Sequence, residues 1–130
     1  MVNTVTQRTL SGATSDQNIY RSITIVSDGS EESDLAVFTN SAFINNASRG
    51  KVMQVWASGS SCQLLLEWDQ TTDSPIAALD PATAGYLDFR SFGGITNPAG
   101  TGATGNVLLT TTNLDAADVV TLILHIDQSL

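Results

Sequence analysis

The stretch KVMQVWASGSSCQLLLEW, residues 51–68, carries the strongest strand signals of the chain. Two apolar-rich segments, residues 51–57 and 62–68, flank the turn-forming run Ser58-Gly59-Ser60-Ser61. The large apolar side chains of the second segment fall on alternate positions and so share one face of a strand: Cys62, Leu64, Leu66 and Trp68. The pattern predicts a β-hairpin that places one face in a hydrophobic core.

Outward from this stretch, further short strands are predicted on both sides. Alternating or β-branched runs, separated by Gly-, Asn- and Asp-containing turns, cover residues 2–10, 19–26, 35–38, 86–89, 106–112 and 118–127, and residues 76–79 form a short strand or a turn. The last run has apolar residues on both faces, which predicts a central strand covered on both sides. We expect the core to contain Ile23, Ile25, Leu64, Leu66, Trp68, Val107, Leu109, Leu122 and Leu124.

The composition agrees with an all-β fold. Among the 130 residues, threonine occurs 16 times and serine 14 times, whereas lysine occurs once. Abundant Thr, Val and Ile favour strands, and no helical periodicity of useful length appears. The sequence therefore predicts an all-β protein, a single antiparallel β-sandwich that is jelly-roll-like. Residues 1–18 are predicted to form an N-terminal arm or an edge strand with its loop, and residues 19–130 the sandwich domain.

Charge and residue counts exclude several classes of function. The net charge is −8, from 13 acidic and 5 basic residues, which argues against binding to nucleic acid or to an anionic membrane surface. One cysteine and one histidine cannot form a disulfide framework or a common zinc site. We expect no metal and no cofactor. The sequence contains no transmembrane run and no apolar signal segment, so we expect synthesis in a cytoplasm.

Two acidic motifs are candidate sites. Asp28, Ser30, Glu32 and Asp34 alternate around Gly29, but the EF-hand pattern is not met, which favours a solvated acidic turn over a calcium site. Glu67 and Asp69 flank Trp68. If Trp68 faces inward, both carboxylates face outward, and no opposed acid is identifiable for glycosidase chemistry. A sugar-binding surface around these three residues is the better alternative.

The remaining candidates also have structural explanations. His125 is a lone strand histidine without the partners of a catalytic triad. Cys62 is expected to be a small buried residue. Gly100-Thr101-Gly102-Ala103-Thr104-Gly105 matches a dinucleotide motif in spacing but lacks its strand and helix, so it reads as a loop that is flexible or packs closely against a partner. We therefore expect no catalytic residues and no enzyme.

Four stretches, taken in order, carry a resemblance to a known group of proteins. They are residues 27–32 (SDGSEE), 66–73 (LEWDQTTD), 86–89 with 93–98 (YLDF and GGITNP) and 104–111 (TGNVLLTT). Together they resemble small all-β virion structural proteins of tailed bacteriophages, over about residues 21–126. The resemblance implies a non-enzymatic structural protein of the phage head. The acidic composition and the end of the chain, HIDQSL, differ from the basic end expected of that group.

The leading functional hypothesis is therefore a capsid decoration or cement protein. It would bind the major capsid protein, stabilise contacts between neighbouring subunits and reside in the virion after synthesis in the host bacterial cytoplasm. A homotrimer is favoured because decoration sites often lie at threefold positions and closed symmetry hides strand edges. The alternative is a receptor- or glycan-binding β-module of a phage tail or fibre. Aromatic residues exposed on one face would favour this alternative, and the candidates are Tyr20, Trp56, Tyr86 and Phe92.

The first ten residues form the candidate partner-binding segment. They alternate like a strand, yet eight mostly polar residues separate them from the next strand. One hypothesis is that they are ordered by contacts with another subunit, and the other is that they form an edge strand of the same sandwich. In the first case the partner-binding residues are Val2, Thr4, Thr6, Arg8 and Leu10.

Overall fold

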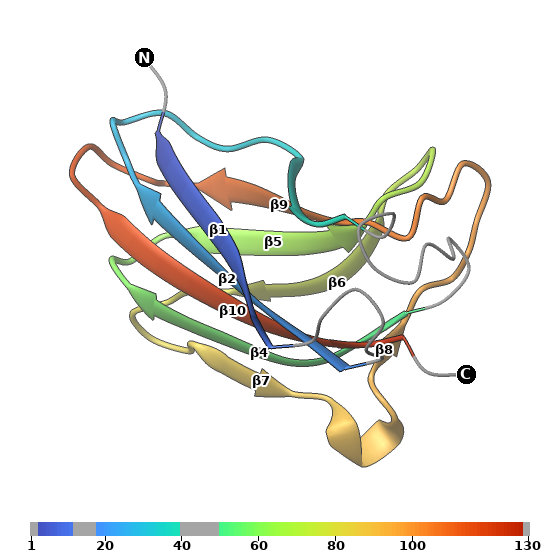
Figure 1. The fold of residues 1–130 in the computed structure, drawn as a ribbon. Helices are drawn as coiled ribbons and strands as arrows, with labels where there is room; N and C mark the ends of the chain where they lie inside the picture. The colour runs from blue at the N-terminus through green and yellow to red at the C-terminus, as the bar shows by residue number, and fades with distance from the viewer. Residues whose placement is uncertain (1–2, 12–17, 40–49, 129–130) are drawn as a thin grey trace.

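The computed structural model describes residues 3–11, 18–39 and 50–128 and shows two antiparallel sheets packed face to face (Figure 1). Sheet A has the order β1 (Thr4–Ser11), β2 (Asn18–Val26), β10 (Val119–Asp127), β4 (Lys51–Gly59) and β7 (Tyr86–Asp88), with β8 (Ile95–Thr96) also paired to β4. Sheet B has the order β3 (Leu35–Phe38), β9 (Val107–Thr112), β5 (Gln63–Trp68) and β6 (Ser74–Leu79). The predicted antiparallel β-sandwich is confirmed.

Helical structure is almost absent from the described residues. It is limited to the 3₁₀ turn η2 (Arg90–Phe92), which lies between β7 and β8. None of the described segments forms a helix with the length and apolar character needed to span a membrane.

The core lies between the two sheets and follows from strand alternation. On β2, Ile19, Ile23 and Ile25 are buried and point inward, so Tyr20, Ser22 and Thr24 point outward. The residues predicted for the core are all buried, from Ile23 and Ile25 of sheet A to Trp68 of sheet B. Burial of these large apolar side chains is the main term that stabilises the sandwich.

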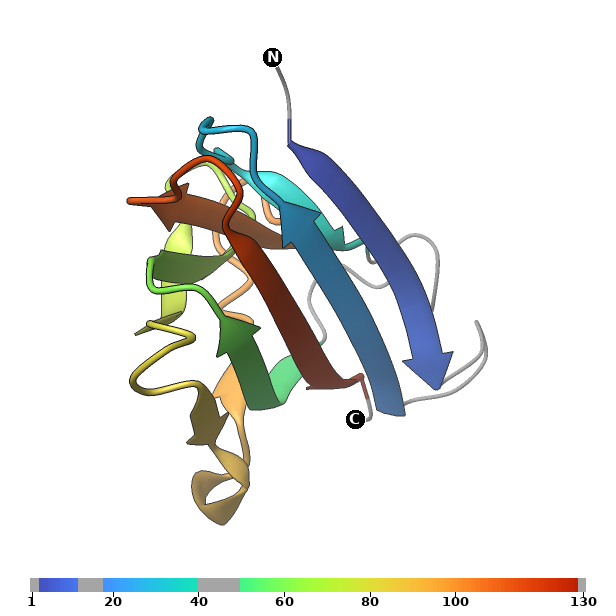
Figure 2. The same ribbon diagram turned by 90° about the vertical axis from the view of Figure 1, so that its left-hand side faces the viewer.

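The hairpin predicted at residues 51–68 is wrong, although both of its strands exist. β4 belongs to sheet A and β5 to sheet B, so the short connection between them crosses from one sheet to the other (Figure 2). The crossing is anchored on β10: the backbone N–H of Ser60 donates to the carbonyl of Val119 at 3.0 Å. Gly59 has φ +124°, and a Cβ there would lie 2.1 Å from that same carbonyl oxygen.

Most other connections also change sheets, which gives the fold its jelly-roll-like character. Among consecutive strands, only β1 with β2 and β5 with β6 are paired as neighbours in one sheet. β10 is a central strand, as predicted, because it lies between β2 and β4. The predicted cover on both sides is wrong for the outer side, where Val119 is 44% exposed, Thr121 and Ile123 are partly exposed, and His125 is buried.

β1 is an edge strand of the same sandwich, the second of the two alternatives for the N-terminal segment. It pairs with β2, and Val5 packs against the core. The Arg21 guanidinium of β2 donates to Gln7 Oε1 at 2.8 Å and to Thr9 Oγ1 at 3.1 Å. The expectation that residues 1–10 depend on another subunit for order is therefore corrected for the described part, residues 3–10.

Candidate functional site

The outer face of sheet A is the most distinctive surface of the molecule. Directly opposed residues of antiparallel strands share a face, so the registers define rows of side chains that cross the sheet. One row joins Tyr20 of β2 to His125 of β10, Gln54 of β4 and Asp88 of β7. The next row, two residues along each strand, is Arg8, Ser22, Ile123, Trp56 and Tyr86.

Four rings from these two adjacent rows lie close together. We call Tyr20, Trp56, Tyr86 and His125 the aromatic cluster. Tyr20 stacks on His125 with ring centroids 4.3 Å apart and planes inclined by 11°. Trp56 and Tyr86 stack at 5.7 Å and 23°, and Tyr20 and Trp56 lie 6.5 Å apart at 32°. Two of these three contacts are stacked and the third is tilted, and the four rings form one continuous group on the open face of the sheet.

Three of the four aromatic residues singled out from the sequence lie in this cluster. Tyr20 and Trp56 are partly exposed, and Tyr86 is 48% exposed. Phe92 does not join them, although it is 65% exposed. It lies in η2 and contacts Phe89 with ring centroids 6.0 Å apart.

A chain of polar side chains lies among the rings. His125 Nε2 is 3.0 Å from Oδ1 of Asn18, and His125 Nδ1 is 3.3 Å from Oε1 of Gln54. Gln54 then donates from Nε2 to the Tyr86 hydroxyl at 2.7 Å. A neutral imidazole has one donor and one acceptor, so it pairs with both amides when one of them presents its NH₂ group. This series of hydrogen bonds fixes the position of the exposed Tyr86 ring.

Burial keeps His125 neutral. His125 is 8% exposed beneath Tyr20, and its desolvation lowers the pKa of the imidazole. Asp127 opposes this effect by raising the pKa, and Arg90 adds to it by lowering the pKa. The centre of the aromatic cluster therefore carries no positive charge near neutral pH.

The rim of the cluster holds an ion pair. Arg90 donates from Nη2 to Asp88 Oδ2 at 2.9 Å, and both its Nε and its backbone N–H donate to Asp88 Oδ1 at 3.0 Å. These hydrogen bonds lower the pKa of Asp88 to about 2. Both side chains are exposed, so the pair orders the η2 turn beside Tyr86 more than it stabilises the fold.

The residues predicted to bind a partner lie on the outward side of β1. Thr4, Thr6, Arg8 and Leu10 are all exposed, and Leu10 is 42% exposed. Val2 lies outside the described residues. The strand is at the end of sheet A and pairs only with β2 among the described strands, so its second edge faces away from the sheet.

The acidic turn at residues 28–34 distributes its carboxylates over separate partners. Asp28 Oδ1 accepts from the backbone N–H of Ser30 at 3.0 Å, Glu31 accepts from Thr111 Oγ1 at 2.8 Å, and Glu32 accepts from Asn3 Nδ2 at 2.6 Å. These hydrogen bonds attach the turn between β2 and β3 to Asn3, just before β1, and to Thr111 of β9. These carboxylates do not converge on one point as the ligands of a calcium loop do.

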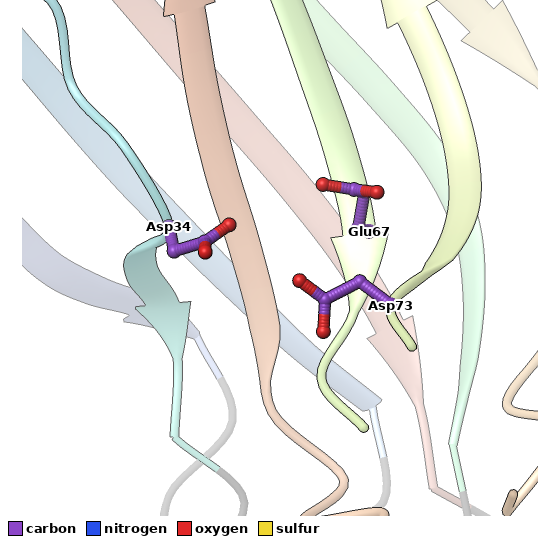
Figure 3. A group of neighbouring side chains, drawn as sticks. All are labelled: Asp34, Glu67 and Asp73. Carbon is purple, nitrogen blue, oxygen red and sulfur yellow. The ribbon is translucent and has the colours of Figure 1, made fainter. Parts of the chain in front are cut away.

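One residue of that turn joins a different acidic group. Asp34, Glu67 and Asp73 place carboxylate oxygens within 4.8 Å of one another on the outer side of sheet B, from either side of β9 (Figure 3). Burial raises the pKa of Glu67, and the negative charges of Asp73 and Asp34 raise it further. The outward orientation of Glu67 is as predicted, but no residue pattern indicated the two opposed acids. Three partly exposed carboxylates do not by themselves identify a metal site, and we assign none.

The remaining sequence candidates have structural roles. Cys62 is buried, and burial raises the pKa of its thiol to about 11, which suits an inert core residue. The glycine-rich loop packs against the turn after β5 of its own chain: Gly100 N–H donates to Gln70 Oε1 at 3.0 Å, and Thr71 N–H donates to the Thr101 carbonyl at 2.9 Å. It contains neither the strand nor the helix of a dinucleotide site in the described residues.

Comparison with known proteins gives little further information. No family model matches the chain, and no curated protein matches it. A solved structure described as "CBM4 structure and function" is similar over 86% of this chain and 84% of its own, with 12% sequence identity and a TM-score of 0.32. A likeness at this TM-score carries no argument about function, so the site must be interpreted from its own geometry.

Proposed function

We propose that this protein is a non-catalytic carbohydrate-binding β-sandwich whose binding surface is the outer face of sheet A. The observation that carries the proposal is the aromatic cluster, in which the partly exposed rings of Tyr20, Trp56 and Tyr86 lie together on one open sheet face, with Trp56 stacked on Tyr86 and Tyr20 tilted against Trp56. Such rings offer flat apolar surface to the C–H face of a sugar. Asn18, which is exposed, places an amide group beside the rings that suits the hydroxyls of the same sugar, and the buried Gln54 holds His125 and Tyr86 in position.

Charge and ring orientation favour sugars over other ligands of aromatic surfaces. Nucleic-acid bases also stack on aromatic rings, but these sites combine the rings with a cationic groove, and this chain has a net charge of −8. Quaternary ammonium ligands are held in cages of rings that enclose the cation. Here Trp56 and Tyr86 stack on one another with ring centroids 5.7 Å apart and planes inclined by 23°, which is not the enclosing arrangement of a cage.

Tryptophan fluorescence tests this proposal directly. The chain has two tryptophans: Trp68 is 1% exposed in the core, and Trp56 is partly exposed in the aromatic cluster. Acrylamide therefore quenches mainly Trp56. Soluble β-glucan, xylan, mannan and dextran are the probes, and at least one should reduce quenching in a saturable manner. If none of the four neutral polysaccharides protects Trp56, the proposal is contradicted.

The biological setting proposed for this binding is a tailed-phage particle, on the sequence resemblance alone. A glycan-binding module of a tail or fibre is the alternative stated from the sequence, and exposed aromatic residues on one face were the feature expected to favour it. Tyr20, Trp56 and Tyr86 provide that feature. The number of copies per particle tests the setting, because a tail component occurs in few copies.

A second candidate function, capsid decoration, is favoured by β1. This eight-residue edge strand contains no proline and one charged residue, Arg8. Few charges and a second edge facing away from the sheet suit addition of a strand from a neighbouring subunit. In this case the partner is the major capsid protein and the protein is a homotrimer. The double variant T6K/L10K should then abolish attachment to capsids without changing the melting temperature, and unchanged attachment would contradict decoration through β1.

A further inference from the structure

Beyond the aromatic cluster, the outer face of sheet A carries a row of hydroxyl groups. Thr6 opposes Thr24, Thr24 opposes Thr121, and Thr121 opposes Ser58, so four neighbouring strands each contribute one hydroxyl. We call Thr6, Thr24, Thr121 and Ser58 the hydroxyl row. Its two central members lie in contact, with Oγ1 of Thr24 3.3 Å from Oγ1 of Thr121.

The hydroxyl row lies at a regular distance from the rings. Same-face residues on a strand are about 7 Å apart, so the row is one such step from the row of Trp56 and two steps from the row of Tyr20. Four adjacent strands also span roughly 14 Å across the sheet. The cluster and the row together thus form a surface larger than a single sugar ring.

The same surface contains no formal charge along its central strands. Along the middle of β2 the outward residues are Tyr20, Ser22, Thr24 and Val26. Along β10 they are Val119, Thr121, Ile123 and His125, and burial keeps His125 neutral. β4 adds Gln54, Trp56 and Ser58. The charged side chains of the face lie at its margins, on β1, on β7 and the adjoining η2 turn, and at the ends of β4 and β10: Arg8, Asp88, Arg90, Lys51 and Asp127. Over these central strands an anionic ligand would lose hydration without meeting a cation.

We propose that the hydroxyl row is a second subsite and that the ligand is an uncharged polysaccharide chain, which extends from the aromatic cluster onto the row. This inference rests on the proposed carbohydrate-binding function. Each threonine or serine hydroxyl provides one donor and two acceptor positions, so the contact between Thr24 and Thr121 leaves capacity for ligand hydroxyls. The rings stack on one sugar, and the row binds sugars further along the same chain.

The test compares a disaccharide and a hexasaccharide prepared from the neutral polysaccharide that protects Trp56. The double variant T24V/T121V removes two hydroxyls while keeping side-chain shape and strand preference. We expect its affinity for the hexasaccharide to fall roughly tenfold, the effect of losing one or two ordinary hydrogen bonds, and its affinity for the disaccharide to change less than about twofold. T112V, which changes an exposed threonine of sheet B, is the matched control.

Each contrary result has a distinct meaning. If T24V/T121V binds the hexasaccharide as the wild type does, or loses affinity equally for both ligands, the second subsite is contradicted. If polygalacturonate binds better than every neutral polysaccharide, and more weakly as salt is added, the uncharged ligand class is contradicted. If no neutral polysaccharide binds the wild type at all, the proposed function itself fails. Circular dichroism of each variant establishes that it is folded.

Discussion

Tyr20 covers His125, the one histidine of the chain, with ring centroids 4.3 Å apart and planes 11° from parallel. The two residues are opposed across β2 and β10 and lie on the outer face of sheet A, where a sheet of this kind commonly meets water. A polar ring is thus buried by side chains of the surface and not by a second layer. This arrangement links the stability of the outer face to the ionisation of His125.

The first prediction concerns pH. Because burial lowers the pKa of His125 in the folded state, the unfolded chain binds a proton more readily, and stability is lost as pH falls below about 6.5. Between pH 7.5 and 5.0 the melting temperature of the wild type should decrease. That of His125→Gln should change less over the same range. Equal pH dependence of the two melting curves would show that His125 is not the titrating group.

The second prediction concerns the acidic group on sheet B. The pKa of Glu67 is raised, so the folded protein is penalised once this carboxylate ionises, and stability is lost as pH rises through the folded pKa. Glu67→Gln removes a like charge beside Asp73 and Asp34, which is worth roughly 0.2–1 kcal/mol. At pH 7 its melting temperature should rise by about 1–4 °C. At pH 3.5 the gain should vanish, and a gain that persists there would contradict the electrostatic explanation.

The third prediction concerns the crossing between β4 and β5. Gly59→Ala combines a positive φ with a Cβ that would lie 2.1 Å from the Val119 carbonyl, so we expect a loss of at least about 3 kcal/mol. Gly93 also has positive φ, +87°, but a Cβ there meets nothing within 4 Å. Gly93→Ala should cost only about 1–2 kcal/mol. Urea denaturation of both variants measures the difference, and equal losses would mean that the close approach at Gly59 is unimportant.

The fourth prediction separates the ring of Tyr86 from its hydroxyl. Tyr86→Phe keeps the ring but removes the oxygen that accepts from the buried Gln54, which should destabilise the protein by about 1–3 kcal/mol. Its polysaccharide affinity should remain within about threefold of the wild type, because the stacking surface is retained. Tyr86→Ala should lose most of the affinity. Calorimetric titration of both variants measures this contrast, which would be absent if the hydroxyl were the group that binds sugar.

The fold was predictable where it depends on local alternation. β3 was expected at residues 35–38 and is found there, and the inward positions of Leu64, Leu66 and Trp68 follow from the period of two. The hairpin at residues 51–68 was not predictable in the same way. Two adjacent strands with one apolar face each can pair, or can face each other across the core, and the choice depends on distant partners such as β10.

The candidate site was predictable in residue type but not in arrangement. Tyr20, Trp56 and Tyr86 were recognisable as large aromatics, but they come from three strands whose order in the sheet is not local information. Gln54 and Asn18 gave no signal, because an isolated amide on a strand is ordinary until its partners are known. For the same reason the sequence pattern around Glu67 does not indicate that Asp34 and Asp73 lie beside it.

The measurement that tests the central claim most directly is affinity electrophoresis through native gels containing β-glucan, xylan, mannan or dextran. It compares the wild type with Trp56→Ala, in the aromatic cluster, and with Phe92→Ala, an exposed aromatic outside it. We predict that at least one polysaccharide retards the wild type and Phe92→Ala equally, whereas Trp56→Ala migrates as it does without polysaccharide. Retardation of Trp56→Ala to the wild-type extent, or no retardation of the wild type in any of the four gels, would contradict carbohydrate binding on the outer face of sheet A.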